Sequence, residues 1–252
     1  MLLDAIDTLF ADCDLADVVP TYKRLGLRLT TGPNKARFAV GSKPARVTVG
    51  LDPGSGGPGL SSVGLRVADV NAAASTLETL GVVVLPSIRP LPAAAWIPDS
   101  AAGVDLMLLP SSIEDRSATD AENAFPLRRL DHLASVAHDL ESTSRFWTDV
   151  LRVPVFGEVV TPTMIIRQFK VGDAIIELLG PASPDSPIHK RPPGLVSMAA
   201  WEVTDLAAAV AQARAAGFTV PDPATGVLPG TRTATIPAAE LGGLAMQLLE
   251  YA

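Results

Sequence analysis

The sequence predicts an α+β protein made by tandem duplication of a module of about 110 residues. The evidence is a series of segments that recur in the same order along the chain. A strand, an aspartate, a helix and another strand occur twice, as do a strand that ends at proline, a strand–helix segment that closes on glycine, and a final apolar strand. Each module is expected to hold two copies of a βαβββ unit.

The first recurring element pairs IDTLFADCDLADVVPTYKRLGLRLT (6–30) with DHLASVAHDLESTSRFWTDVLRVPV (131–155). In both copies an apolar strand is followed by Asp-Leu and an amphipathic helix. Asp14 and Asp139 hold equivalent places, and a carboxylate there accepts hydrogen bonds from the first N–H groups of a helix. We therefore expect both residues to be N-caps.

The second and third elements follow in register. The strand ARVTVGLDP (45–53) matches AIIELLGP (174–181), and a Gly/Pro/Ser connector follows each. The segment SSVGLRVADVNAAASTLETLGV then matches SMAAWEVTDLAAAVAQARAAGF, each with a strand, an N-cap aspartate, an Ala-rich helix and a closing glycine. The matched positions are Asp69 and Asp205 for the caps, and Gly81 and Gly217 for the ends.

The last element sets the boundaries. GVDLMLLP (103–110) matches GLAMQLLE (243–250), so each copy ends on the same strand. We assign residues 1–112 to the first module and 126–252 to the second. The polar, acidic segment 113–125 between them is typical of a linker.

Charge and composition exclude several classes of function. A net charge of −7, a pI near 4.9 and the absence of a large basic stripe argue against nucleic-acid binding. The single cysteine, Cys13, cannot form an intrachain disulfide, and its acidic neighbours raise the pKa of a thiol. The amino-terminal residues lack a basic n-region, and no apolar run is long enough to cross a membrane. We expect a cytoplasmic monomer or homodimer that binds a small molecule.

The repeated βαβββ pattern resembles the vicinal-oxygen-chelate superfamily, which includes glyoxalase I, methylmalonyl-CoA epimerase, extradiol dioxygenases and bleomycin-binding proteins. The resemblance covers nearly the whole chain. It is strongest in LDHLASVAHDLESTSRFW, VGDAIIELLGPASPDSPI and EVTDLAAAVAQARAAG, so the second module is most similar to the epimerase-like members. The resemblance implies curved glyoxalase-type sheets.

The resemblance also implies four ligand positions in the second module. They fall on His132, Glu177, Met198 and Gln247. A thioether is a poor ligand for hard divalent ions, whereas imidazole, carboxylate and amide oxygen can coordinate them. The sequence therefore allows two states, one with a divalent metal held by His132, Glu177 and Gln247 and one without a metal. The sequence does not distinguish Zn, Ni, Co, Mn and Fe.

Alternation along the strands supports an inward direction for these side chains. Glu177 lies between isoleucine and leucine, and a buried carboxylate is costly unless it is paired. In the family fold the first and fourth strands are neighbours, so His132 and Glu177 are expected to meet. The alternative is an inert His–Glu pair left from a metal-binding ancestor. Arg167 and Met198 are candidate substrate-binding residues.

The first module lacks the ligand pattern. Its matching positions are Asp7, a Val47–Thr48–Val49 stretch, Ser62 and Met107. One carboxylate among such residues does not hold a divalent ion. We expect this module to be a structural partner without a metal.

These positions favour a glyoxalase- or epimerase-like enzyme, of isomerase or lyase type. It would act on a small carbonyl or acyl substrate through an enediolate, with Glu177 and His132 as catalytic residues. The epimerases carry a carboxylate near the place of Thr161, which puts the epimerase reaction itself in doubt. The alternative is a metal-free binding or drug-sequestering protein of the bleomycin-resistance type. Substrate identity does not follow from the fold.

Overall fold

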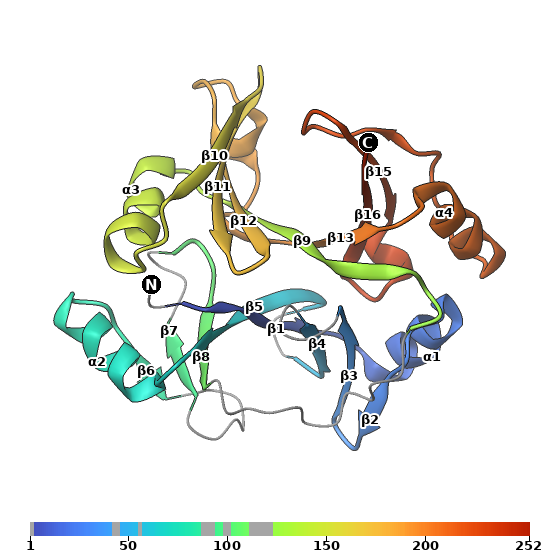
Figure 1. Ribbon diagram of the computed structural model, residues 1–252, viewed down its shortest axis with the longest axis horizontal. Helices are drawn as coiled ribbons and strands as arrows, with labels where there is room; N and C mark the ends of the chain where they lie inside the picture. The colour runs from blue at the N-terminus through green and yellow to red at the C-terminus, as the bar shows by residue number, and fades with distance from the viewer. Residues whose placement is uncertain (1–2, 42–45, 55–56, 87–93, 98–101, 111–122) are drawn as a thin grey trace. The chain divides into compact units, whose positions relative to one another are not determined.

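The computed structural model describes residues 3–41, 46–54, 57–86, 94–97, 102–110 and 123–252 (Figure 1). Most of the predicted linker 113–125 lies outside these residues, since only its last three residues belong to them. The predicted module boundaries therefore stay a prediction. None of the helices in the described ranges is both long and apolar enough to cross a membrane.

The described part of the first module forms an eight-stranded sheet with two helices. The strand order is β2-β3-β4-β1-β5-β8-β7-β6. The strands are β1 (Ala5–Asp12), β2 (Thr30–Gly32), β3 (Lys35–Val40), β4 (Val47–Asp52), β5 (Gly59–Val67), β6 (Leu85–Pro86), β7 (Ala95–Ile97) and β8 (Leu106–Pro110), and the helices are α1 (Leu15–Leu25) and α2 (Val70–Thr79).

The second module repeats this arrangement in its described residues. Its order is β10-β11-β12-β9-β13-β16-β15-β14, which is the first order with eight added to each number. The elements are β9 (Leu127–Val136), α3 (Leu140–Arg145), the π-helical turn η1 (Phe146–Val150), β10 (Val155–Val160), β11 (Met164–Val171), β12 (Ala174–Pro181), the 3-10 turn η2 (Pro187–Lys190), β13 (Gly194–Val203), α4 (Leu206–Ala215), β14 (Ala224–Thr225), β15 (Thr231–Ile236), the 3-10 turn η3 (Ala238–Glu240) and β16 (Ala245–Tyr251). The α+β class and the tandem duplication are confirmed.

The predicted caps hold all four helices in equivalent places. The carboxylates of Asp14, Asp69, Asp139 and Asp205 each accept a hydrogen bond from a backbone N–H in the first turn, at 2.8–3.0 Å. Gly81 and Gly217 follow the last residues of α2 and α4 with φ of +82° and +85°. Glycine adopts this left-handed conformation without strain, which explains its place at both helix ends.

Contacts between residues divide the chain into two compact units, and each unit takes segments from both modules. Unit 1 contains Met1–Asp7, Ser62–Glu114 and Leu133–Val196, and unit 2 contains Thr8–Ser61, Asp115–His132 and Ser197–Ala252. A half of the first module therefore shares a unit with a half of the second.

In unit 1, buried polar contacts join segments of the two modules. Trp147 donates from Nε1 to the carbonyl of Ala102 at 3.0 Å, and its ring packs against Phe169 with the two planes tilted by 30°. The hydroxyl of Ser135 donates to the carbonyl of Gly103. Since a buried indole N–H needs an acceptor, the first module completes the core around Trp147.

In unit 2, the segment before β9 and the elements after β13 pack against the first module. Asn123 accepts from the backbone N–H of Arg28 at 2.9 Å, and the Arg24 guanidinium lies 4.7 Å from the centroid of the Phe218 ring. Gly59 has φ of +141°, and a Cβ there would lie 2.2 Å from Oγ of Ser197. This close approach of β5 to β13 requires glycine.

Candidate functional site

Glu177 lies in the middle of β12, on a sheet face that carries few polar groups. Its register partner on β11 is Gln168, which donates from Nε2 to Oε1 of Glu177 at 2.8 Å. Both side chains are buried, with residue exposures of 6% and 7%. Because a buried carboxylate is stabilised only when hydrogen-bonded, this pair fixes the orientation of Glu177.

Toward the open end of the hairpin, away from its turn, the same face is apolar. Ile166 and Leu179 are register partners two residues from Gln168 and Glu177, so all four side chains lie on one side of the β11–β12 hairpin. A buried cluster continues from there, formed by Ala134, Val136, Ile166, Leu179 and Ile188, with Val159, Met164 and Val196 partly buried against it. Glu177 therefore stands at the border of an apolar surface within unit 1.

The sequence carries a signal for the pairing of Gln168 with Glu177. A two-residue turn, Gly172–Asp173, joins Val171 to Ala174, which are register partners. In such a hairpin, positions equally far from the turn face each other, which pairs 168 with 177. Gly157 on β10 also belongs to this arrangement, because a Cβ there would lie 2.7 Å from Oε1 of Gln168.

His132 lies on β9 and is oriented by its neighbour in sequence. Its Nδ1 lies 2.8 Å from Oδ1 of Asp131, and both residues are buried. With Nδ1 engaged, only Nε2 could ligate a metal or exchange a proton with a substrate. His132 belongs to unit 2 and Glu177 to unit 1, and the direct pairing of the two side chains stays a prediction.

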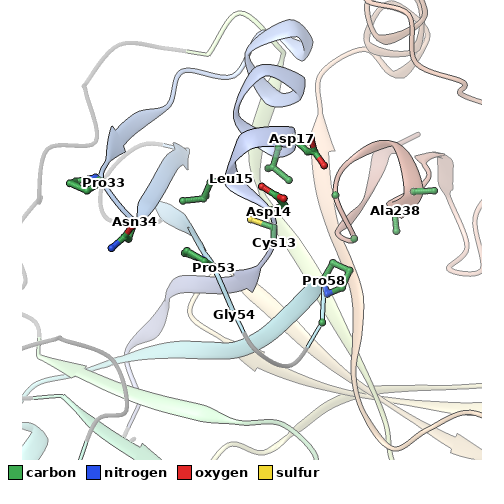
Figure 2. Close-up of a pocket in the computed structure, with 15 residues that line it drawn as sticks. Cys13, Asp14, Leu15, Asp17, Pro33, Asn34, Pro53, Gly54, Pro58 and Ala238 are labelled. Atoms are coloured by element: carbon green, nitrogen blue, oxygen red, sulfur yellow. The ribbon is translucent and has the colours of Figure 1, made fainter.

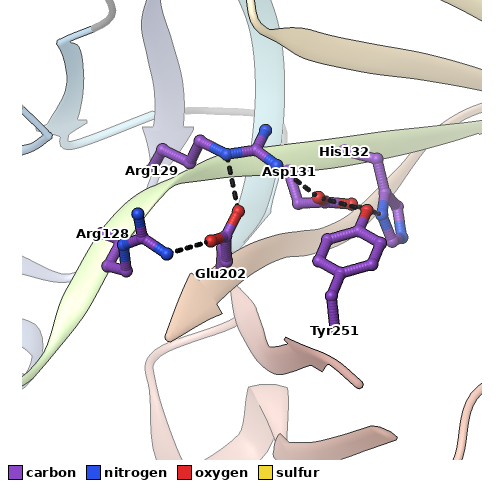
Figure 3. A network of polar contacts seen from close by, with 6 residues as sticks. All are labelled: Arg128, Arg129, Asp131, His132, Glu202 and Tyr251. Atoms are coloured by element: carbon purple, nitrogen blue, oxygen red, sulfur yellow. Dashed lines mark hydrogen bonds and ion pairs between the residues drawn. The ribbon is translucent and has the colours of Figure 1, made fainter. Parts of the chain in front are cut away.

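Asp131 is part of a larger polar network (Figure 3). Tyr251 donates from its hydroxyl to Oδ2 of Asp131 at 2.8 Å, and Nη2 of Arg129 lies 3.4 Å from the same oxygen. Glu202 on β13 accepts from Nε of Arg129 at 2.6 Å and from Nη1 of Arg128 at 2.5 Å. This network joins β9, β13 and β16 through side chains that sequence reasoning missed.

Electrostatics within this network keeps Asp131 ionised. Burial alone would raise the pKa of Asp131. The hydrogen bonds from His132 and Tyr251, with the charges of His132 and Arg129, outweigh burial, and the net pKa of Asp131 lies below its ordinary value. Burial and the hydrogen bond to the Asp131 carboxylate raise the pKa of Tyr251 to about 12.

Met198 and Gln247 lie on neighbouring parallel strands of unit 2. Met198 is the partner of Ala245, and Gln247 is the partner of Ala200 on β13 and of Thr235 on β15. Both residues are half-buried. Their predicted roles in substrate binding and metal ligation stay predictions.

Arg167 is already bound by protein groups. Its guanidinium donates to Glu158 at 2.7 Å, to Glu141 at 2.8 Å and to Oγ of Ser144 at 3.1 Å. Two of these partners lie on α3, so Arg167 points to the helix-covered side of β11, opposite to Gln168. The side chain of Arg167 points away from the face that carries Glu177. Its role in substrate binding stays a prediction.

The donor set fits a tightly bound divalent ion poorly. In the described ranges, no three or more His, Cys, Asp or Glu side chains form a group that could hold a metal ion. The predicted ligands His132, Glu177 and Gln247 supply one carboxylate, one imidazole and a neutral amide. Such a set provides a single negative charge, and a thioether stands at the remaining position.

The first module differs at the matching positions. Asp7 accepts from Nε of Arg66 at 3.1 Å and from Nη2 of the same guanidinium. Ser62 and Met107 are buried. This ion pair neutralises the Asp7 carboxylate, and the absence of a metal from the first module stays a prediction.

A cleft of about 820 Å³ lies within unit 2, and none of the predicted site residues lines it (Figure 2). Its wall contains the start of α1, the connector before β5 and the η3 segment. Burial, followed by the charges of Asp52, Asp12 and Asp14, raises the pKa of the Cys13 thiol at its edge to about 11. The expected effect of the acidic neighbours on Cys13 is therefore confirmed.

Fold and site together define a two-module protein with a buried carboxylate and an oriented histidine in its second module. Residues 131–235 match the sequence model of the Glyoxalase/Bleomycin resistance protein/Dioxygenase superfamily. This match confirms the predicted resemblance for the stretch that holds Asp131, His132, Glu177 and Met198. A search of the curated proteins finds no significant match.

Solved structures show the same fold over the whole chain. 2,2',3-Trihydroxybiphenyl 1,2-dioxygenase from Sphingomonas wittichii strain RW1 is similar over 98% of this chain and 90% of its own, with 20% identity and a TM-score of 0.69. A xylose isomerase-like TIM barrel/4-hydroxyphenylpyruvate dioxygenase fusion protein is similar over 99% of this chain and 49% of its own, with 17% identity and a TM-score of 0.68. At these identities the likeness concerns the fold alone.

Methylmalonyl-CoA epimerase from Mycobacterium tuberculosis aligns with 54% of this chain and 96% of its own. The identity is 24% and the TM-score is 0.47.

Proposed function

We propose that the second module is an enzyme of the glyoxalase and epimerase kind. It moves a proton at the carbon next to the carbonyl of a small acyl or carbonyl substrate, through an enediolate-type intermediate. The observation that carries the proposal is the buried Glu177 carboxylate, which Gln168 holds at one oxygen beside an apolar surface. A fixed carboxylate at an apolar border is suited to act as a general base.

In the proposed reaction Glu177 removes the α-proton, and the electron pair of the broken C–H bond moves onto the carbonyl oxygen to form the enediolate. The protonated Glu177 carboxyl then returns a proton to the carbon and the carbonyl forms again. His132 is the second proton carrier, because Asp131 engages Nδ1 and directs chemistry to Nε2. The apolar cluster beside Glu177 excludes water from the carbanion. Since the donor set fits a divalent ion poorly, each step uses side chains of this chain.

Proton exchange in heavy water tests this function directly. Wild-type protein is incubated with acyl-CoA and α-hydroxy-carbonyl compounds, and deuterium uptake at the α-carbon is followed by NMR. Glu177→Gln is expected to lower the exchange rate about 100-fold or more, since general base catalysis contributes that much. Glu158→Gln makes the same chemical change at an exposed carboxylate and should keep the rate.

The outcomes separate the two functions. Equal exchange in wild type and Glu177→Gln contradicts the proposed base. Tight binding of such compounds without exchange, by the wild type and by Glu177→Gln, supports the bleomycin-resistance type of binding protein instead.

A further inference from the structure

The strongest unexplained feature of the second module is the chain of contacts that ends on His132 (Figure 3). His132 and Asp131 are exposed by only 7% and 1%, and Nδ1 of the imidazole lies 2.8 Å from Oδ1 of the carboxylate. Asp131 is not among the four ligand positions that the resemblance implies. Its location suggests a role that acts through His132.

The second carboxylate oxygen of Asp131 also faces donor groups. Oδ2 accepts from the hydroxyl of Tyr251 at 2.8 Å and faces Nη2 of Arg129 at 3.4 Å. Arg129 is in turn fixed by Glu202, which also binds Arg128. The carboxylate therefore has donors on both sides, and its plane is set by three elements of the sheet.

Tyr251 is placed by its hydroxyl rather than by apolar burial. The residue is 46% exposed, so its ring gains little from packing. Its hydrogen bond to Asp131 ties β16 to β9 across the sequence. A half-exposed tyrosine with its hydroxyl on a fully buried carboxylate is consistent with a role in orienting that carboxylate.

The geometry selects one tautomer of His132. An ionised carboxylate only accepts hydrogen bonds, so Nδ1 must carry the proton that bridges it to Asp131. In the neutral ring Nε2 is then the acceptor. Hydrogen bonds of this kind are the usual means by which proteins fix which ring nitrogen reacts.

We propose that Asp131 and Tyr251 are positioning residues of the site, which hold the His132 imidazole with its proton on Nδ1 and present Nε2 as the reacting nitrogen. The catalytic use of Nε2 rests on the proposed function, whereas the tautomer does not. Asp131→Asn tests it best. Arg129 can only donate, so it favours the amide oxygen on its own side and turns the amide NH2 toward Nδ1. The ring must then accept at Nδ1 and carry its proton on Nε2.

Nitrogen NMR of labelled histidine reads the tautomer without substrate. The chain has three histidines, so His138→Gln and His189→Gln assign the spectrum. At mildly alkaline pH an ordinary imidazole is neutral. Wild-type His132 is expected to show a protonated Nδ1 and an acceptor Nε2, and Asp131→Asn to reverse the pattern. Tyr251→Phe removes a hydrogen bond that orients the carboxylate, so part of the rings should lose the Nδ1 contact and a mixture of tautomers is expected. Asp149→Asn, an equal loss of charge at an exposed site, should match the wild type.

A wild-type ring protonated on Nε2, or an unchanged ring in Asp131→Asn, overturns the inference. If Asp131→Asn does not fold, the substitution Tyr251→Phe at a half-exposed residue provides the test. A spectrum identical to that of the wild type would show that Tyr251 does not position His132. Once an exchange activity is measured, Asp131→Asn is expected to lower kcat about 10- to 100-fold with KM little changed, as for other orienting residues. Absence of exchange activity overturns the proposed function. The NMR spectrum alone then decides whether His132 has the inferred tautomer.

Discussion

Gln168 donates a 2.8 Å hydrogen bond to Glu177, its register partner across the β11–β12 hairpin. The amide reaches this position because the facing residue on β10 is Gly157, which leaves room for its other end. Three adjacent strands thus determine the direction of one carboxylate.

Gly157→Ala should disturb Glu177 without unfolding the protein. The new Cβ would lie 2.7 Å from Oε1 of Gln168, so the flexible amide must move and its bond to Glu177 weakens. We expect a loss of stability of about 1 kcal/mol or less, because the group that moves is a side-chain end, together with a clear loss of exchange activity. Urea unfolding and the deuterium assay measure both quantities.

Gly50→Ala is the matched control, since its Cβ would meet Phe10 at an ordinary 3.5 Å. Equal losses of activity in the two alanine variants would show that the Gln168–Glu177 bond is not the cause.

The stability of the protein should fall at alkaline pH through Tyr251. Its pKa is raised from 10.0 to about 12 in the folded protein. The folded state therefore holds a proton that the unfolded state has lost, so the contribution is complete below about pH 10 and is lost as the pH rises to about 12. Unfolding midpoints of wild type and Tyr251→Phe are expected to converge over this range. A constant difference between the two proteins across it would contradict the raised pKa.

Cys13 should react slowly with thiol reagents. Burial and three nearby aspartates raise its pKa from 9.0 to about 11, and only the thiolate is nucleophilic. At mildly alkaline pH we expect alkylation about 100-fold slower than in urea, which corresponds to two pKa units. A folded-state rate close to the rate in urea would be inconsistent with this environment.

Tag-free protein should carry no stoichiometric divalent ion after treatment with a chelator, because the predicted ligands supply one carboxylate only. Elemental analysis should include His138→Gln, since the rings of His138 and His189 lie 6.1 Å apart and can bind metal incidentally. A stoichiometric ion that survives in His138→Gln and is lost in His132→Ala would show that the candidate site holds a metal after all.

The fold could be predicted because its signals are local and repeated. An aspartate before each helix and a glycine after α2 and α4 mark the same points in both modules. The structure has an N-cap at each aspartate and a left-handed glycine just after the end of α2 and of α4. The division into two units could not be predicted, because it depends on which half-modules pack together. Contacts such as Trp147 with Ala102 have no signal in the pattern of either segment.

The candidate site could be predicted only in part. His132 and Glu177 were found through the resemblance to the superfamily, and the hairpin turn could have identified Gln168. Asp131 was missed because neighbours on a strand normally point to opposite faces, yet this carboxylate reaches the ring next to it. The face that Arg167 occupies follows from strand alternation, whereas its ion pairs with carboxylates of α3 and β10 depend on packing that the sequence pattern does not reveal.

Each unit contains segments of both modules, and this constrains how the sequence can change in evolution. The first module supplies the acceptor for Trp147, the acceptor for Ser135 and the helix that packs on Phe218. Selection for folding therefore constrains these residues whatever chemistry the first module carries out. Mutations at these contacts in the first half would be eliminated for their effect on folding before any effect on turnover.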